Sequence, residues 1–179
     1  MEKRKVVIYI SMSLDGFIAT KDDDLSWLEI VQKEGLDYGY EDMMNRVDTY
    51  IIGRKTYEVI KELTGGSLPQ AKTLDCYVLT RQKLENEERV TFYNGDIKRL
   101  ITKLKSQEGK DIYCDGGGQA VKMLMEHNLV DEFIISVIPI ILGDGKRLFI
   151  GGTPMDKLQL VDSQKFKTGL VQLHYKRKN

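Results

Sequence analysis

Short runs of β-branched and aromatic residues alternate along this chain with longer amphipathic runs, and this alternation constrains the fold more than any other feature. Strands are expected at 6–11, 49–53, 75–80, 89–95, 111–114 and 131–142. Helical patterns are expected at 54–63, 96–109 and 119–129, and a further, interrupted helical region within 26–47. Strands that alternate with helices favour an α/β fold built on a largely parallel sheet.

The end of the chain has a different pattern. The segments LQLVDSQKF (158–166) and GLVQLHYKR (169–177) resemble the two arms of a hairpin that turns around residues 167–169. An antiparallel hairpin is therefore expected at one edge of the sheet. No internal repeat or linker interrupts the sequence, so residues 1–179 are expected to form a single domain.

The composition excludes several classes of protein. The 27 Lys and Arg residues balance 27 Asp and Glu residues, which argues against a general nucleic-acid-binding protein. The longest apolar run, VIPIILG (137–143), is too short to span a membrane, and no signal peptide is recognised, so a cytoplasmic location is expected. Cys76 and Cys114 lie in apolar runs and lack metal-site spacing, so buried thiols and no metal site are predicted.

Three expected strands end in residues with unusual chemistry. These ends are Gly53-Arg54-Lys55-Thr56, Thr80-Arg81 and Asp115-Gly116-Gly117-Gly118. The carboxyl ends of parallel strands share one edge of a sheet, and ligands bind there. Unpaired N–H groups at a helix start, glycine backbone and basic side chains all suit phosphate. A ligand with two phosphate regions would use all three segments. NADPH carries an extra phosphate besides its pyrophosphate, so it fits better than NADH.

Each of these features also has a simpler explanation. A glycine cluster can mark only a tight turn between a strand and a helix, and a basic cluster is often a solvated surface. The run GGGQAV (116–121) does not match G-x-G-x-x-G, because Val121 occupies the last glycine position. The ligand interpretation therefore depends on the three segments meeting at one edge.

In this order, the motifs resemble those of the dihydrofolate-reductase-like fold. They are SMSLDGFIA (11–19), IIGRKTYE (51–58), YVLTRQ (77–82) and DIYCDGGGQAVKMLM (111–125). The segment DEFIISVIPIILGDGKRLF (131–149) is more similar to the reductase domain of riboflavin-biosynthesis proteins, the RibD C-terminal family. The resemblance implies a three-layer α/β/α fold with a mostly parallel central sheet and an antiparallel C-terminal hairpin.

The resemblance also implies how NADPH would bind. Gly53, Arg54, Lys55 and Thr56 would hold its 2′-phosphate and pyrophosphate side, and Thr80 and Arg81 would flank the adenosine. The pyrophosphate and the approach to the nicotinamide would involve Gly116, Gly117, Gly118 and Gln119. Ile18 and Ala19 would line the nicotinamide pocket.

The substrate side is less defined in the sequence. Asp24, in DDDLSWLE (22–29), could take the place of the acid that supports protonation in dihydrofolate reductases, although the Pro-Trp pair of those enzymes is absent. The alternative is that Asp24 caps an exposed turn or helix. Asp15 could border the substrate pocket or serve only the turn, and Trp27 could stack on a flat ring or belong to the core. GDGKR (143–147) could offer a phosphate site or be a plain surface loop.

Three functions remain open from the sequence. The first is an NADPH-dependent oxidoreductase acting on a small heterocycle or a ribosylaminopyrimidine, similar to 5-amino-6-(5-phosphoribosylamino)uracil reductase of riboflavin biosynthesis. The second is a dihydrofolate reductase acting on a pterin, and the third is a nucleotide-binding protein without turnover.

The chain carries no H-x-E or P-C-x-x-C deaminase signature. No nucleic-acid or membrane partner is expected, and the resemblance suggests a homodimer supported by the apolar strand 133–142.

Overall fold

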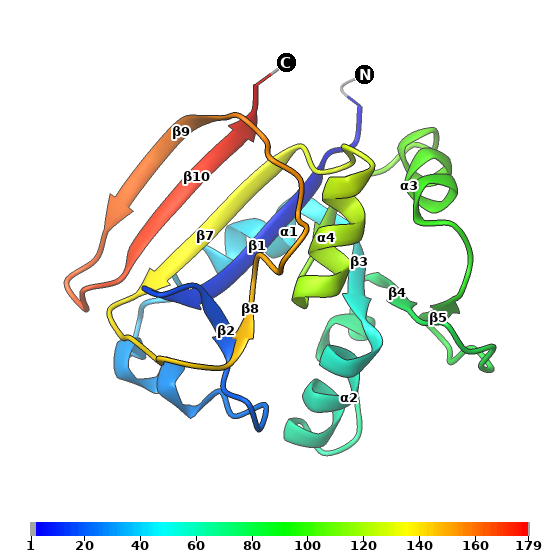
Figure 1. Cartoon of the computed structure of the whole chain (residues 1–179). Helices are drawn as coiled ribbons and strands as arrows, with labels where there is room; N and C mark the ends of the chain where they lie inside the picture. The colour runs from blue at the N-terminus through cyan, green and yellow to red at the C-terminus, as the bar shows by residue number, and fades with distance from the viewer. Residues whose placement is uncertain (1–2, 179) are drawn as a thin grey trace.

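The computed structural model describes residues 3–178 and contains the expected alternation of strands and helices (Figure 1). The strands are β1 (Val6–Ser13), β2 (Phe17–Ala19), β3 (Val47–Gly53), β4 (Asp75–Leu79), β5 (Val90–Tyr93), β6 (Asp111–Cys114), β7 (Glu132–Ile138), β8 (Lys146–Arg147), β9 (Leu158–Lys165) and β10 (Val171–Arg177). The α-helices are α1 (Tyr40–Arg46), α2 (Arg54–Leu63), α3 (Ile97–Lys105) and α4 (Gly118–Glu126). Short 3₁₀ helices occupy Ser26–Val31 and Pro69–Lys72.

Eight strands form one sheet in the order β5-β4-β3-β6-β1-β7-β10-β9. The first six of these strands run parallel to their neighbours. Strand β10 then pairs antiparallel with β7, and β9 pairs antiparallel with β10. The predicted fold class, a mostly parallel sheet with an antiparallel C-terminal hairpin, is confirmed.

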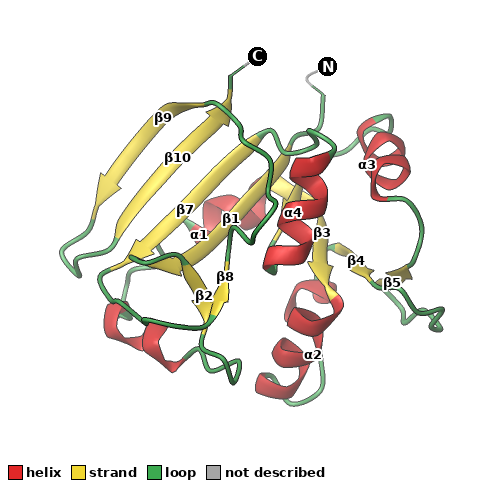
Figure 2. Ribbon diagram, in the orientation of Figure 1, coloured by secondary structure: helices red, strands yellow, loops and turns green. Residues whose placement is uncertain are grey.

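Helices cover both faces of the parallel part of this sheet. Figures 1 and 2 show α4 in front of the sheet and α1 behind it. The alternation of side chains along β3 feeds two cores: Ile51 packs with residues of α3 and α4, whereas Tyr50 and Ile52 pack with Met43 of α1 and Tyr57 of α2. No helix in the described part of the chain is long and apolar enough to cross a membrane.

Both cysteines lie inside these cores. Cys76 and Cys114 are buried free thiols, as the apolar runs around them predicted. Burial raises the pKa of each thiol to about 12. Neither cysteine is therefore a nucleophile at neutral pH.

The region 26–47 differs from a single interrupted helix. It holds the 3₁₀ helix Ser26–Val31, a loop, and then α1. The loop takes left-handed backbone at Gly35, Tyr38 and Gly39, and such conformations end regular helix. Asp37 closes the loop by accepting the backbone N–H groups of Gly39 and Glu41.

Strand β7 is shorter than expected, and it is not an edge. It ends at Ile138 rather than at residue 142, because Pro139 has no N–H group to continue the ladder. It pairs with β1 on one side and with β10 on the other. The expectation that 133–142 supports a homodimer stays a prediction, and β7 could contribute to it only through its side chains and not by edge pairing. The edge strand on this side is β9, whose eight residues are all exposed.

Candidate active site

The starts of two helices meet at the carboxyl edge of the parallel strands. The backbone N–H of Gly53, just before α2, donates to the carbonyl of Gly116 at 2.8 Å. The backbone N–H of Gly117, just before α4, donates to Oγ1 of Thr56 at 3.1 Å. The two glycine-containing segments singled out in the sequence are thus in direct contact.

Neither of these helices is capped by its own side chains. The residues at the cap positions of α2 and α4 are Gly53 and Gly117, which have no side chain to accept the N–H groups of the first turn. Oγ1 of Thr56 accepts only the N–H of Gly117 itself. Neither first turn contains an acidic residue. By contrast, α3 is capped by Asp96, whose carboxylate accepts from Lys98 N and Arg99 N. Two uncapped amino ends side by side leave positive partial charge at one place.

The glycine triplet also has reasons internal to the protein. Gly116 has a φ of +90°, which disfavours any side chain. A Cβ on Gly117 would lie 3.0 Å from Oγ1 of Thr56, and a Cβ on Gly118 would overlap the carbonyl oxygen of Arg147. The peptide between Gly116 and Gly117 is cis. Tight packing therefore accounts for the triplet, and it also leaves the backbone at Gly117 without a side chain over it.

The side chain of Arg54 joins the first two strand ends. Arg54 donates from Nε to Glu58 Oε1 at 2.7 Å and from Nη1 to Oε1 of Gln82. Gln82 follows Arg81, and its backbone N–H donates to Oγ1 of Thr80 at 3.1 Å. The loop after β4 is thus tied to the start of α2. Lys55 and Arg81 are exposed beside this contact.

The predicted nicotinamide side lies next to the glycine loop. Strand β2, which contains Ile18 and Ala19, pairs with β8 in a small second sheet. Cδ1 of Ile18 is 3.7 Å from the Cβ position of Gly117. Ala19 is buried, whereas Gln119 at the first turn of α4 is exposed. The apolar side chain of Ile18 therefore borders the glycine loop at the predicted nicotinamide site.

Asp15 and Asp24 both hold turns. Asp15 accepts the backbone N–H groups of Leu142 and Gly143 and the hydroxyl of Ser13. Asp24 is exposed and accepts both the hydroxyl and the N–H of Ser26, at 2.7 and 3.1 Å. The Ser13 hydroxyl lowers the pKa of Asp15 and the Ser26 hydroxyl lowers that of Asp24, so both are carboxylates at neutral pH. The geometry of Asp24 matches the capping alternative.

Trp27 and the GDGKR segment are engaged within the protein. Trp27 is 6% exposed and packs with Val31, Ile138 and Leu170, as the core alternative expected. Its indole Nε1 has no hydrogen-bond partner among residues 3–178. Lys146 forms an ion pair with Asp23, and the guanidinium of Arg147 lies over the ring of Phe17, 4.4 Å from its centroid. Both basic side chains of GDGKR therefore have partners within the protein.

A further acid, Asp115, was not among the predicted catalytic residues. It lies between the end of β6 and Gly116, and only part of it is accessible to solvent. Tyr50 donates its hydroxyl to Oδ2 at 2.6 Å, and Tyr113 is a second hydrogen-bonding partner. Burial raises the pKa of Asp115 to about 6, against the lowering effect of the two tyrosines. The sequence signal was an acid directly before the glycine triplet at a strand end.

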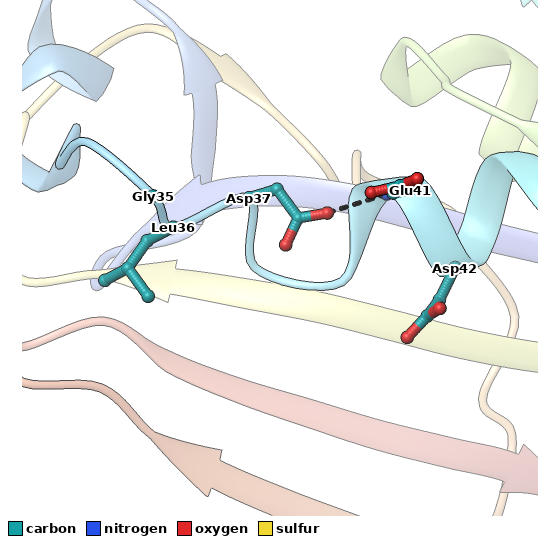
Figure 3. A pocket seen from close by; sticks show the side chains of 5 residues that line it. All are labelled: Gly35, Leu36, Asp37, Glu41 and Asp42. Atoms are coloured by element: carbon teal, nitrogen blue, oxygen red, sulfur yellow. Dashed lines mark hydrogen bonds between the residues drawn. The ribbon is translucent and has the colours of Figure 1, made fainter.

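A surface pocket of about 460 Å³ lies elsewhere, at the loop before α1. Figure 3 shows its lining residues, Gly35, Leu36, Asp37, Glu41 and Asp42, with Asp37 bonded to the backbone of Glu41. Three carboxylates line it and no basic side chain does. An anionic nucleotide would be repelled there, so this pocket is a poor candidate for a phosphate-bearing ligand.

The mostly parallel sheet with its C-terminal hairpin defines a dihydrofolate-reductase-like fold. The two helix starts lie at the carboxyl edge of its parallel strands, where open α/β sheets in general bind ligands. Within that class the chain belongs to the family of the RibD C-terminal domain, whose model matches residues 4–172. The family resemblance stated from the motifs is thereby confirmed.

Two proteins of Bacillus subtilis (strain 168) are similar over nearly their whole length. YwjB is 43% identical over 176 residues, covering 98% of this chain and 99% of YwjB. YyaP is 31% identical over 188 residues, covering 98% of this chain and 96% of YyaP. Both alignments therefore include nearly all of this chain.

Solved structures share the fold. A candidate riboflavin biosynthesis protein from Shewanella sp. PV-4 superposes with a TM-score of 0.88 at 29% identity, covering 98% of this chain and 99% of that one. The diaminohydroxyphosphoribosylaminopyrimidine deaminase/5-amino-6-(5-phosphoribosylamino)uracil reductase of Thermotoga maritima gives a TM-score of 0.72 at 14% identity. That comparison covers 98% of this chain but 57% of the Thermotoga chain. At this low identity it supports the fold alone.

Proposed function

We propose that this chain is an NADPH-dependent reductase that delivers hydride to a small heterocyclic substrate of the ribosylaminopyrimidine class. The observation that carries the proposal is the contact between two uncapped helix starts, at α2 and α4, on the carboxyl edge of the sheet. Membership of the RibD C-terminal family supports a reductase rather than a protein that only binds nucleotides.

The residues at this edge fit a phosphorylated dinucleotide. The N–H groups at the start of α2 and of the loop 116–119 would receive the pyrophosphate, with the hydroxyl of Thr56 between them. Arg54, with Lys55 and the loop Thr80–Arg81, would hold the 2′-phosphate and the adenosine. Ile18 and Ala19 would form the apolar side of the nicotinamide site.

The chemistry requires a proton in addition to the hydride. When bound, the dihydronicotinamide supplies the hydride. Addition of hydride to a C=N or C=O group leaves an electron pair on the heteroatom, and that atom must be protonated. Asp115 lies at the glycine loop, and its pKa of about 6 keeps part of its population protonated near neutral pH. We assign the proton-donating role to Asp115 rather than to the exposed, ionised Asp24.

A turnover assay with the full chain tests this function. NADPH consumption would be followed on addition of ribosylaminopyrimidine phosphates and, separately, of dihydrofolate. The proposal expects consumption with a ribosylaminopyrimidine. Consumption with dihydrofolate alone would favour the pterin alternative, and no consumption with either, despite bound NADPH, would favour a protein that binds nucleotide without turnover.

Two matched variants separate the candidate acids. Asp115→Asn keeps the size of the side chain but removes the proton, so turnover should fall by about 100-fold or more. Asp24→Asn should leave turnover within about two-fold, because its carboxylate serves the Ser26 turn. The reverse pattern, with Asp24 essential and Asp115 dispensable, would contradict the assignment.

A further inference from the structure

Arg54 is held from two directions at the start of α2. Its Nε donates to Glu58, one turn further along the same helix, and its Nη1 donates to Gln82 from the loop after β4. Within the described residues, Nη2 forms no hydrogen bond. The Arg54 side chain is 32% exposed and that of Glu58 is 53% exposed, so a dissolved ligand can reach both.

The stability of the helix does not explain this arrangement. A cation at the start of a helix is unfavourable, because the N–H groups there carry positive partial charge. An ion pair spaced i,i+4 is also weaker when the cation precedes the acid, as in Arg54–Glu58. Gln82 contributes a neutral acceptor from outside the helix. The guanidinium is thus positioned at some cost where an anion would bind best.

Glu58 and Gln82 would act differently on a phosphate at Arg54. Gln82 is uncharged, so it fixes the guanidinium without opposing an anion. Glu58 competes for Nε and also repels a phosphate dianion. The only acidic side chain bonded to Arg54 within residues 3–178 is that of Glu58, and Lys55 and Arg81 lie nearby.

We infer that Glu58 is a specificity-determining residue that weakens binding of a ligand phosphate at Arg54, while Gln82 positions the guanidinium for it. This inference rests on the proposed function, in which that phosphate is the 2′-phosphate of NADPH. It predicts that Glu58 makes the preference for NADPH over NADH smaller than Arg54 would give without it. The preference is therefore adjustable at a single position outside the nicotinamide and substrate regions.

The variant Glu58→Gln isolates the charge. Glutamine keeps an oxygen acceptor for Nε but carries no negative charge. Binding of a ligand with a 2′-phosphate should tighten by about three- to ten-fold at low salt, and the gain should shrink as salt screens the exposed charges. Binding of the same ligand without that phosphate should not change.

The control variant is Glu62→Gln. Glu62 is exposed on the same helix, one further turn from Arg54, and carries the same charge. Glu62→Gln removes the same charge from the same helix as Glu58→Gln does, but farther from Arg54. The affinities for the ligands with and without the 2′-phosphate should therefore stay within about two-fold. A third variant, Gln82→Ala, should weaken binding of the 2′-phosphorylated ligand only, because the guanidinium loses its neutral partner.

The experiment is calorimetric titration of the full chain with adenosine 2′,5′-bisphosphate and with adenosine 5′-monophosphate. These fragments need no nicotinamide or substrate site. Selective tightening in Glu58→Gln but not in Glu62→Gln is the expected result. If the unaltered chain binds the bisphosphate and Glu58→Gln leaves its affinity unchanged or weaker, the inference is overturned and the proposed function survives. If the unaltered chain does not bind the bisphosphate, the proposed cofactor site fails and the inference fails with it.

Discussion

The pKa of Asp115 depends more on the residues around it in the fold than on its sequence motif. Its carboxyl follows β6, touches the hydroxyl of Tyr50, and lies one residue before the glycine that bonds Gly53. Asp24 is the acid that the sequence suggested as a catalytic candidate, but its carboxylate is exposed to solvent and accepts hydrogen bonds from Ser26. Burial raises one pKa, whereas local hydrogen bonds lower the other. Of the two carboxyls, only that of Asp115 keeps a protonated fraction near neutral pH.

The pH dependence of turnover should report this difference. Because the pKa of Asp115 is raised to about 6, the protonated donor is abundant below that pH and is lost above it. We therefore expect kcat/KM to decline as the pH rises through about 6, and Asp115→Asn to lack this decline. The Tyr50 hydroxyl lowers the pKa of Asp115, so Tyr50→Phe should move the decline to higher pH. A profile that Tyr50→Phe leaves in place would argue against Asp115 as the donor.

Among the structural elements, α4 is positioned by the glycine at its start. Gly118 packs against the carbonyl groups of Arg147, the last residue of β8, and of Leu148, which follows it. An alanine would normally stabilise a first-turn position by reducing the entropy of the unfolded chain. Here the neighbours are backbone atoms that cannot rotate away, so the steric term should dominate.

We therefore expect Gly118→Ala to lower the free energy of unfolding by about 2 kcal/mol or more. Urea unfolding measures this directly. The matched control is Gln119→Ala, where an exposed side chain is removed one residue later and the change should stay within about 0.5 kcal/mol. A neutral Gly118→Ala would mean that the packing contact is not required.

The same elements show what the sequence could predict. The alternation of strands and helices predicted a mostly parallel sheet with an antiparallel hairpin, because β-branched runs and amphipathic periods follow from backbone geometry. The order of the strands in the sheet was not predicted. The motifs located Thr56 and the glycine loop, which do meet. For Asp24 the sequence offered the turn role that its bonds to Ser26 match, but it could not choose between that role and catalysis. The partners of Asp15 and Lys146 could not be predicted, because they lie in loops that are distant in sequence. The raised pKa of Asp115 likewise depends on Tyr50, which is distant in sequence.

At the scale of the whole molecule, a cluster of charged side chains joins segments that are distant in sequence. It lies at the amino ends of the parallel strands, opposite their carboxyl edge. Glu132 of β7 contacts Arg46 of α1 at 2.8 Å, Lys5 ahead of β1 at 3.0 Å and His174 of β10 at 3.0 Å. Arg46 also pairs with Asp111 of β6. Burial alone would raise the pKa of Glu132, but Arg46 and Lys5 outweigh it and lower the pKa to about 2. The cluster therefore stabilises the fold only while Glu132 is ionised.

Acid should release this stabilisation. A carboxyl whose folded-state pKa is lowered stabilises the fold above its unfolded pKa, near 4.5, and loses that effect as the pH falls toward 2. Glu132→Gln should reduce the free energy of unfolding by about 3 kcal/mol at pH 7 and by much less near pH 2. The exposed Glu29→Gln is the control. A deficit in Glu132→Gln that is independent of pH would show that packing, not charge, is lost.

The homodimer implied by the family resemblance stays a prediction at this scale. The edge strand on the hairpin side of the sheet is β9, and its exposed Leu160 and Val161 are each 50% accessible. A long exposed edge strand is a liability in a monomer, since it can pair with other chains. Sedimentation of the purified chain decides the state.

The measurement that tests the central claim most directly is equilibrium binding of NADPH and NADH, side by side, to the full chain and to Arg54→Ala. Arg89→Ala is the matched control, because Arg89 pairs with Asp75 at the opposite edge of the sheet. We predict that the full chain and Arg89→Ala bind NADPH more tightly than NADH. Arg54→Ala should lose about ten-fold or more of its NADPH affinity and little of its NADH affinity. Equal binding of the two cofactors, or an NADPH affinity that survives Arg54→Ala, would contradict the account.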